Sequence, residues 1–230
     1  MPADKLQTAT LSTEPGTELR TGGAVLLIGA VIFLVTVGFE LIIGWPPAAG
    51  EATDITTFMV QHWSTLQAIW AVQMLGVLLI ASSALVLLQS RRLTGMWRPA
   101  SVIWSMVAVA GIVLTVAYGF ALGSYPALLP SVEENPEVFA AVRGGARFLL
   151  NSALAVALFG FSLVFIREGL APDGIVPRSW IVGIAVAVVL AIMAAAFGLL
   201  QPVVASAVIF FVPMLLGLAL CWRAGRQLAP

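Results

Sequence analysis

The sequence predicts an all-α, polytopic membrane protein, built as a bundle of six transmembrane helices with two short external interfacial helices. Two observations carry this prediction. The 230 residues are 60% hydrophobic and only 10% charged, whereas soluble domains carry about 25% charged residues. The chain also contains apolar segments of about 20 residues, the length that an α-helix needs to cross a hydrocarbon core of about 30 Å.

Residues 1–20 are polar and lack apolar periodicity, which predicts a disordered cytoplasmic tail. A six-helix transmembrane domain over residues 21–226 and a C-terminal tail over residues 227–230 follow. Pro202 predicts a tight turn before the last span, because proline cannot donate a backbone hydrogen bond. The expected spans cover about residues 23–45, 66–89, 100–123, 146–166, 180–200 and 203–222.

The basic residues predict the orientation of these spans. If the N-terminus is cytoplasmic, every Lys and Arg lies on the cytoplasmic side except Arg143 and Arg147. Such a bias is typical of the positive-inside rule. We therefore expect a multi-pass protein of the bacterial inner membrane with both termini in the cytoplasm and the lipid bilayer as its solvent.

The two longer external links, residues 46–65 and 124–145, carry local helix signals. Asp54 is a candidate cap for one short segment, and Asn135 followed by Pro136 marks the start of another over residues 137–142. These signals predict two interfacial helices lying over the bundle. Gly144 and Gly145 are then expected to form a joint between the second interfacial helix and the fourth span.

Small residues predict where helices approach closely, because glycine and alanine let backbones meet in lipid. One stripe runs through the fifth span, and Gly119 with Gly123 forms a second in the third span. Two interpretations stay open for such stripes: packing within the chain, or contact with a homodimer mate or a partner membrane protein. The stripe of the fifth span consists of Gly183, Ala187, Ala191 and Ala195.

Polar side chains within the spans gather in the expected outer leaflet. A charged acid at the centre of a membrane helix costs about 2.5 to 3.5 kcal/mol on insertion scales. We therefore expect a nearby group to stabilise Glu40 within its span. Our hypothesis is an outward-facing pocket lined by Glu40, Gln73, Arg147 and Asn151. The alternative is a packing ion pair between Glu40 and Arg147 that binds no ligand.

Arg143, Tyr118 and His62 complete the candidate ligand-binding set. Arg143 stands one helical turn before Arg147, and Tyr118 falls toward the outer end of the third span. His62 lies just outside the second span, where a histidine is more typical of a solvated or capping residue than of a ligand. A single histidine and a single cysteine favour neither a metal site nor a cofactor.

The sequence also disfavours two function classes. The formal net charge is zero, so no basic field attracts nucleic acid. No nucleophile elbow, zinc-protease motif or phosphate-binding loop is present, and Ser152 beside Asn151 has no nearby base. We therefore expect no enzymatic activity.

The layout of a polar N-terminal tail, six spans, two external links of about twenty residues and a final tight hairpin resembles that of bacterial six-pass membrane proteins of unknown function. The resemblance covers the whole length and implies an integral membrane protein of bacteria. It carries no functional residue, because no motif supports it.

These observations predict a membrane protein that binds a small or lipid-like ligand in an outer-leaflet polar pocket, as a sensor, carrier or accessory factor. A structural or assembly subunit of a larger membrane complex is one alternative. A small-solute transporter is another, although transport predicts polar residues on both sides of the midplane.

Overall fold

The computed structural model describes residues 15–44, 52–89, 98–132, 134–170, 176, 180–181 and 211–222, and all their regular structure is helical. No strand occurs among these residues, as the all-α prediction requires. The elements are α1 (Pro15–Ile43), α2 (Ala52–Gln89), α4 (Arg98–Leu128), the 3₁₀ turn η1 (Leu129–Ser131), α5 (Pro136–Leu170) and a C-terminal helix (Phe211–Trp222).

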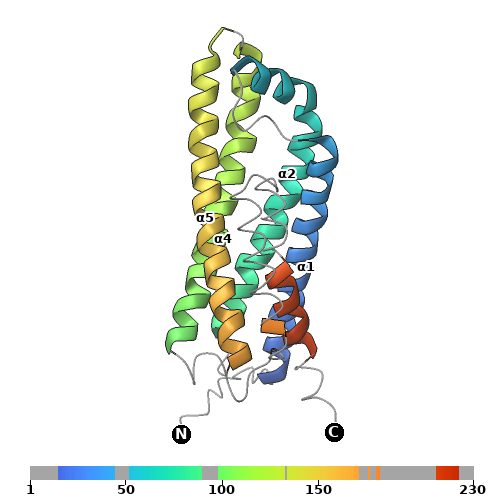
Figure 1. Cartoon of the computed structure of the whole chain (residues 1–230), viewed down its shortest axis with the longest axis vertical. Helices are drawn as coiled ribbons and strands as arrows, with labels where there is room; N and C mark the ends of the chain where they lie inside the picture. Colours follow the sequence, from blue (N-terminus) through green and yellow to red (C-terminus); the bar gives the residue numbers. More distant parts are fainter. Residues whose placement is uncertain are drawn as a thin grey trace, which may run out of the picture.

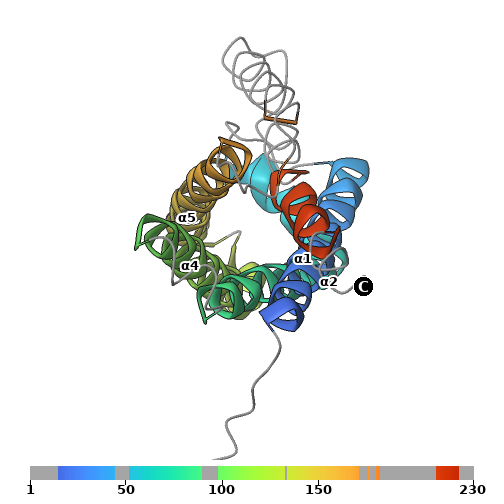
Figure 2. The same cartoon turned by 90° about the horizontal axis from the view of Figure 1, so that it is seen from below.

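The long helices stand side by side in a curved row (Figures 1 and 2). Consecutive helices pack together, α1 against α2, α2 against α4 and α4 against α5. The C-terminal helix lies against α1, where Gly217 approaches the Gly23 carbonyl oxygen. We call the end at which α1 and α4 stop and α2 and α5 start the distal end; it is uppermost in Figure 1.

Four helices are long and apolar enough to cross a membrane: Thr17–Ile43, Asp54–Gln89, Ser101–Ser131 and Pro136–Arg167. They cover the first four predicted spans except for residues 44, 45 and 100. The predicted fifth span and the start of the sixth lie outside the described residues, apart from Trp180 and Ile181. The stripe from Gly183 to Ala195 is likewise outside them. Phe211–Trp222 is an apolar helix and is the described part of the sixth predicted span.

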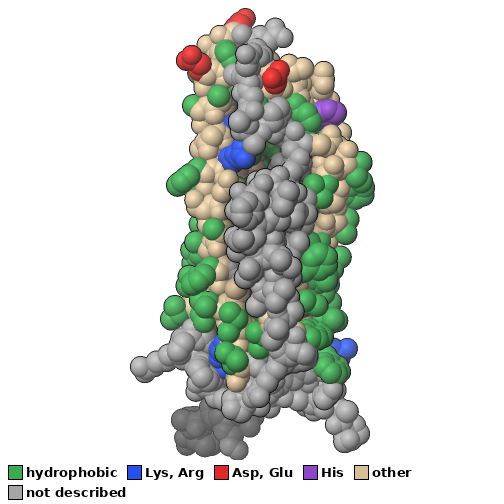
Figure 3. Space-filling view, viewed as in Figure 1, with side chains coloured by type: hydrophobic (Ala, Val, Ile, Leu, Met, Phe, Trp, Pro, Cys, Tyr) green, Lys and Arg blue, Asp and Glu red, His purple; other side chains and the backbone are tan. Residues whose placement is uncertain are grey.

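Exposed apolar side chains form a band along the long helices, and single ones such as Val60 and Val138 lie nearer the distal end. On α5 the band runs from Phe148, which is 71% exposed, to Leu170. At about 1.5 Å per residue this stretch measures about 33 Å, close to the thickness of a hydrocarbon core. On α1 the band ends at Ile42. The helices continue past the band at the distal end, where acidic side chains are exposed (Figure 3).

Two predicted interfacial helices are not separate elements. The segment around Asp54 is the start of α2, which runs unbroken from Ala52 to Gln89. Its first turns cross the distal end before the helix descends beside α1 (Figure 1). No proline or glycine interrupts residues 52–75, so nothing ends the helix there.

The predicted joint at Gly144 and Gly145 is also wrong, because α5 continues from Pro136 through both glycines. Neither glycine has a positive φ. Glycine weakens a helix by about 1 kcal/mol relative to alanine, which flanking turns of good helix formers can offset. The predicted start at Pro136 itself is confirmed.

The first helix begins earlier than predicted, at Pro15 rather than after residue 20. Proline at the start of the helix and Glu18 in its first turn both favour this beginning. Leu19 is buried, so the added turn packs against the protein. At the other end, Gly44 takes a φ of +91° and its N–H donates to the Glu40 carbonyl oxygen at 3.0 Å, which closes α1.

Glycines lie where neighbouring helices meet. A Cβ atom added at Gly29 of α1 would stand 2.7 Å from the Gly76 carbonyl oxygen of α2. Similar close approaches join Gly111 to Ala81 and Gly160 to Val107. By contrast, a Cβ atom at Gly119 or Gly123 would contact none of the described residues. The sequence stripe on α4 is therefore not a packing contact between described helices.

Candidate functional site

The buried polar cluster consists of Glu40 of α1, Trp70 and Gln73 of α2, and Tyr118 of α4. Glu40 is only 4% exposed, although it lies one turn from the end of its helix. The indole Nε1–H of Trp70 donates a hydrogen bond to Glu40 Oε1 at 2.5 Å. Hydrogen bonds to charged groups contribute about 1.5–3 kcal/mol, so this contact partly offsets the burial of the carboxylate.

Gln73 is the most unusual member of the buried polar cluster. It is 1% exposed, and neither its amide nitrogen nor its amide oxygen makes a hydrogen bond of good geometry. The amide nevertheless lies next to the Glu40 carboxylate. Tyr118, also buried, is within electrostatic range of Glu40. The cluster thus holds polar groups whose bonding capacity exceeds the partners that the described residues supply.

An aromatic layer from α2, α4 and α5 adjoins the buried polar cluster and shares Trp70 with it. Trp70 packs edge-on against Tyr125 of α4 with ring centroids 5.9 Å apart. Trp63 contacts both rings, at 5.9 Å from Trp70 and 5.7 Å from Tyr125. Phe139 of α5 continues the layer, 5.4 Å from Tyr125. Such pairs stabilise by about 0.5–1.5 kcal/mol beyond the area that they bury, so the layer helps to hold α2, α4 and α5 together.

The arginine pocket lies beside this layer, with which it shares Phe139, between the first turns of α2 and α5. Its volume is about 250 Å³. Arg143 and Arg147 stand one helical turn apart on α5 and both face it, and Arg143 is also within electrostatic range of Tyr125. The full lining is Ile55, Thr56, Pro136, Phe139, Ala140, Arg143, Gly144 and Arg147.

Neither arginine is neutralised by the part of the chain that the structure describes. Arg143 and Arg147 form no ion pair there. Arg147 is directly followed by Phe148, the first large side chain of the apolar band on α5. The two guanidinium groups therefore stand at the border between the polar distal end and the band, and basic side chains are visible below the acidic ones in Figure 3.

The structure divides the predicted set of site residues into two groups. Glu40, Gln73 and Tyr118 belong to the buried polar cluster, whereas Arg143 and Arg147 line the arginine pocket. The predicted ion pair between Glu40 and Arg147 is not formed, since the hydrogen-bond donor to Glu40 is Trp70. Their helices explain this result, because α1 and α5 are at opposite ends of the described row and do not pack together.

Asn151 and His62 belong to neither group. Asn151 is exposed on α5, one turn beyond Arg147, and does not line the pocket. The His62 ring packs against Phe58 at 4.6 Å on the first turns of α2. No group of three or more His, Cys, Asp or Glu side chains comes together within the described ranges. A role in ligand binding stays a prediction for both residues.

The sequence prediction missed two residues with polar side chains: Trp70 of the buried polar cluster and Thr56 of the arginine pocket. Trp70 stands three residues before Gln73, so both fall on one face of α2. That spacing could have identified Trp70 as a donor for Glu40, because an indole N–H in an apolar setting needs an acceptor. Thr56 gave no such signal, since its place in the pocket depends on the path of α2 across the distal end.

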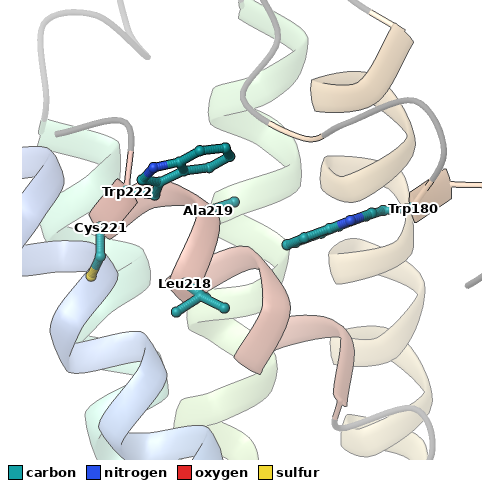
Figure 4. A pocket seen from close by; sticks show the side chains of 5 residues that line it. All are labelled: Trp180, Leu218, Ala219, Cys221 and Trp222. Atoms are coloured by element: carbon teal, nitrogen blue, oxygen red, sulfur yellow. The ribbon is translucent and has the colours of Figure 1, made fainter. Parts of the chain in front are cut away.

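A second hollow of about 510 Å³ lies at the opposite end of the bundle. The rings of Trp180 and Trp222 point into the space beside Ala219 (Figure 4). Cys221 turns toward α1, where its Sγ lies 4.0 Å from the Arg20 carbonyl oxygen. Because none of the described residues that line this hollow is charged, we assign no binding chemistry to it.

The arginine pocket and the buried polar cluster are thus the two places where the described chain concentrates polar groups. Comparison with protein-family models, with curated proteins and with solved structures found no match to this chain.

Proposed function

We propose that this protein is an inner-membrane protein that binds an anionic small or lipid-like ligand in the arginine pocket, as a sensor, carrier or accessory factor. The observation that carries the proposal is the pair Arg143 and Arg147, which face one pocket without an acidic partner among the described residues. Guanidinium groups bind carboxylate and phosphate through paired hydrogen bonds, so an anionic group is the matching ligand chemistry.

The position of the pocket favours an amphiphile. The arginines border the apolar band at Phe148, and the pocket also offers apolar walls at Ile55 and Phe139. A headgroup held by the arginines would leave its chains beside the band, where hydrocarbon is the surrounding solvent. A volume of about 250 Å³ accommodates a headgroup rather than a whole lipid. The same chemistry suits a small free anion, so the test must separate the two.

The test is to identify molecules that remain bound to the full-length protein after mild detergent extraction. Wild type is compared with Arg143→Gln/Arg147→Gln, and Arg20→Gln, at the opposite end of α1, is the matched charge control. A charge-assisted hydrogen bond contributes about 1.5–3 kcal/mol, so losing each arginine weakens binding about tenfold or more. Mass spectrometry should find one anionic species with wild type and the control, strongly depleted in the double variant.

The identity of that species separates a lipid from a soluble anion. Equal retention by all three proteins, or no retained anion on wild type, would contradict the proposal. A co-purifying protein chain that persists in the double variant would instead favour an assembly subunit.

A further inference from the structure

The buried polar cluster contains a charge without a countercharge. Glu40 is packed by α2, which presents Trp70 and Gln73, and it is near Tyr118 of α4. None of these side chains is cationic. No Lys, Arg or His of the described chain pairs with Glu40. Buried carboxylates in membrane helices persist when they are paired, neutralised or coordinated.

The same cluster also has unused oxygen ligands. The Gln73 amide is buried next to the Glu40 carboxylate, and neither of its polar atoms makes a hydrogen bond of good geometry. Trp70 occupies only one of the two carboxylate oxygens of Glu40. A second carboxylate oxygen and an amide oxygen therefore lie close together, with Tyr118 within electrostatic range of Glu40. Hard oxygen atoms of this kind bind protons and hard cations rather than soft metals.

We propose that Glu40 and Gln73 form a buried site for one exchangeable monovalent cation, a proton or an alkali ion. A single positive charge neutralises the single carboxylate, whereas a divalent ion would leave a net charge in the apolar interior. A proton on the free oxygen would be donated to the Gln73 amide oxygen; an alkali ion would be coordinated by both. Either cation gives the orphaned amide oxygen its partner.

This site is distinct from the arginine pocket, because none of the four residues of the buried polar cluster lines that pocket. A failure to find an anionic ligand in the arginine pocket would therefore leave the proposed cation site unaffected, and the reverse also holds. Trp70 is common to the cluster and the layer, so occupancy at Glu40 is expected to alter the environment of one indole ring.

The experiment measures labelling of Glu40 in the full-length protein by dicyclohexylcarbodiimide, which partitions into apolar regions and reacts with protonated carboxyl groups. Peptide mass spectrometry quantifies the adduct. One arm raises the pH in sodium-free choline buffer, and the other adds Na⁺ at fixed pH and constant ionic strength. The exposed Glu137 is the internal control, and Glu40→Gln shows that the adduct is specific.

We expect Glu40 to be labelled in the sodium-free buffer, because the reagent partitions into the apolar interior, and the labelling to fall several-fold as the pH rises. Loss of labelling on adding Na⁺ at fixed pH would show that an alkali ion shares the site; an effect of pH alone would identify the proton as the occupant. Gln73→Met, which removes the amide, should reduce the response to the occupying cation.

The proposal is overturned if the labelling of Glu40 responds to neither arm, or changes in parallel with that of the exposed Glu137 in both arms. Thermal unfolding provides a second readout: the melting temperature of wild type, but not of Glu40→Gln, should rise with the concentration of the occupying cation. Identical cation dependence in the two proteins would equally reject the site.

Discussion

At the scale of single residues, the hydrogen bond from Trp70 to Glu40 decides how a carboxylate is accommodated inside an apolar bundle. The bond joins α1 to α2 at 2.5 Å, near the distal border of the apolar band. A buried acceptor that loses its donor costs about 1–3 kcal/mol, more for a charged group. Trp70 is therefore more than an aromatic packing residue.

Trp70→Phe is expected to lower the free energy of unfolding of the detergent-solubilised protein by about 1–3 kcal/mol or more, because it leaves the buried Glu40 carboxylate without its hydrogen-bond donor. Trp63→Phe is the matched control, since Trp63 belongs to the same aromatic layer but makes no hydrogen bond within the described residues. Chemical unfolding measures both. In the Glu40→Gln background the Trp70 substitution should cost less; equal costs in both backgrounds would show that the two residues are not coupled.

The sequence identified most of the residues in this region but not how they are grouped. Glu40, Gln73 and Tyr118 were predictable, because a polar side chain inside an apolar span is conspicuous. Pairing Glu40 with Arg147 was the wrong inference, since similar depth in a membrane does not make two helices neighbours. The order of helices in the row depends on tertiary packing, and one sequence offers only weak signals for it.

At the scale of elements, glycines determine how closely the helices in the row can pack. Gly29 and Gly76 face each other across α1 and α2, and each would place a Cβ atom 3.0 Å or less from the other's carbonyl oxygen. The sequence stripes drew attention to Gly119 and Gly123, which meet no described helix. Glycine spacing predicted that close contacts exist, but not which glycines make them.

Gly29→Ala should destabilise the protein by about 1–3 kcal/mol, because the added methyl group meets a backbone oxygen at 2.7 Å and the helices must separate. Gly38→Ala on the same helix is the control. Its methyl group meets nothing within 4 Å, so the better helix propensity of alanine should leave stability unchanged or raise it by up to about 1 kcal/mol. Thermal unfolding measures the stability of both variants. If Gly29→Ala loses no more stability than Gly38→Ala, the close contact between α1 and α2 is rejected.

Helix continuity shows where local sequence signals fail. Asp54 is typical of a residue that caps a helix start. The spacing of Ser64 and Gln67 is typical of a capping box, which also marks a helix start. None of them starts an element, because α2 is already helical from Ala52. Capping signals favour a beginning only where the preceding chain cannot be helical. Asn135 with Pro136 succeeded because the 3₁₀ turn and the bend before it separate α4 from α5.

At the scale of the whole molecule, both proposed sites require that the apolar band lies in the bilayer. The band matches a hydrocarbon core in height. The buried polar cluster lies just inside its distal border, and the arginine pocket lies at that border. The distribution of Lys and Arg favours placing the distal end outside the cell. A ligand from the external leaflet or the external medium would then reach the arginine pocket directly.

Cysteine accessibility in intact cells tests this arrangement most directly. Starting from Cys221→Ser, single cysteines replace Glu137 at the distal end, Phe159 in the apolar band and Gln89 at the opposite end, all of which are exposed. A membrane-impermeant maleimide should label Glu137→Cys in intact cells, Gln89→Cys only after permeabilisation, and Phe159→Cys in neither case. Labelling of Phe159→Cys, or labelling of the two ends from the same side, would contradict a bundle that crosses the membrane with its distal end outside.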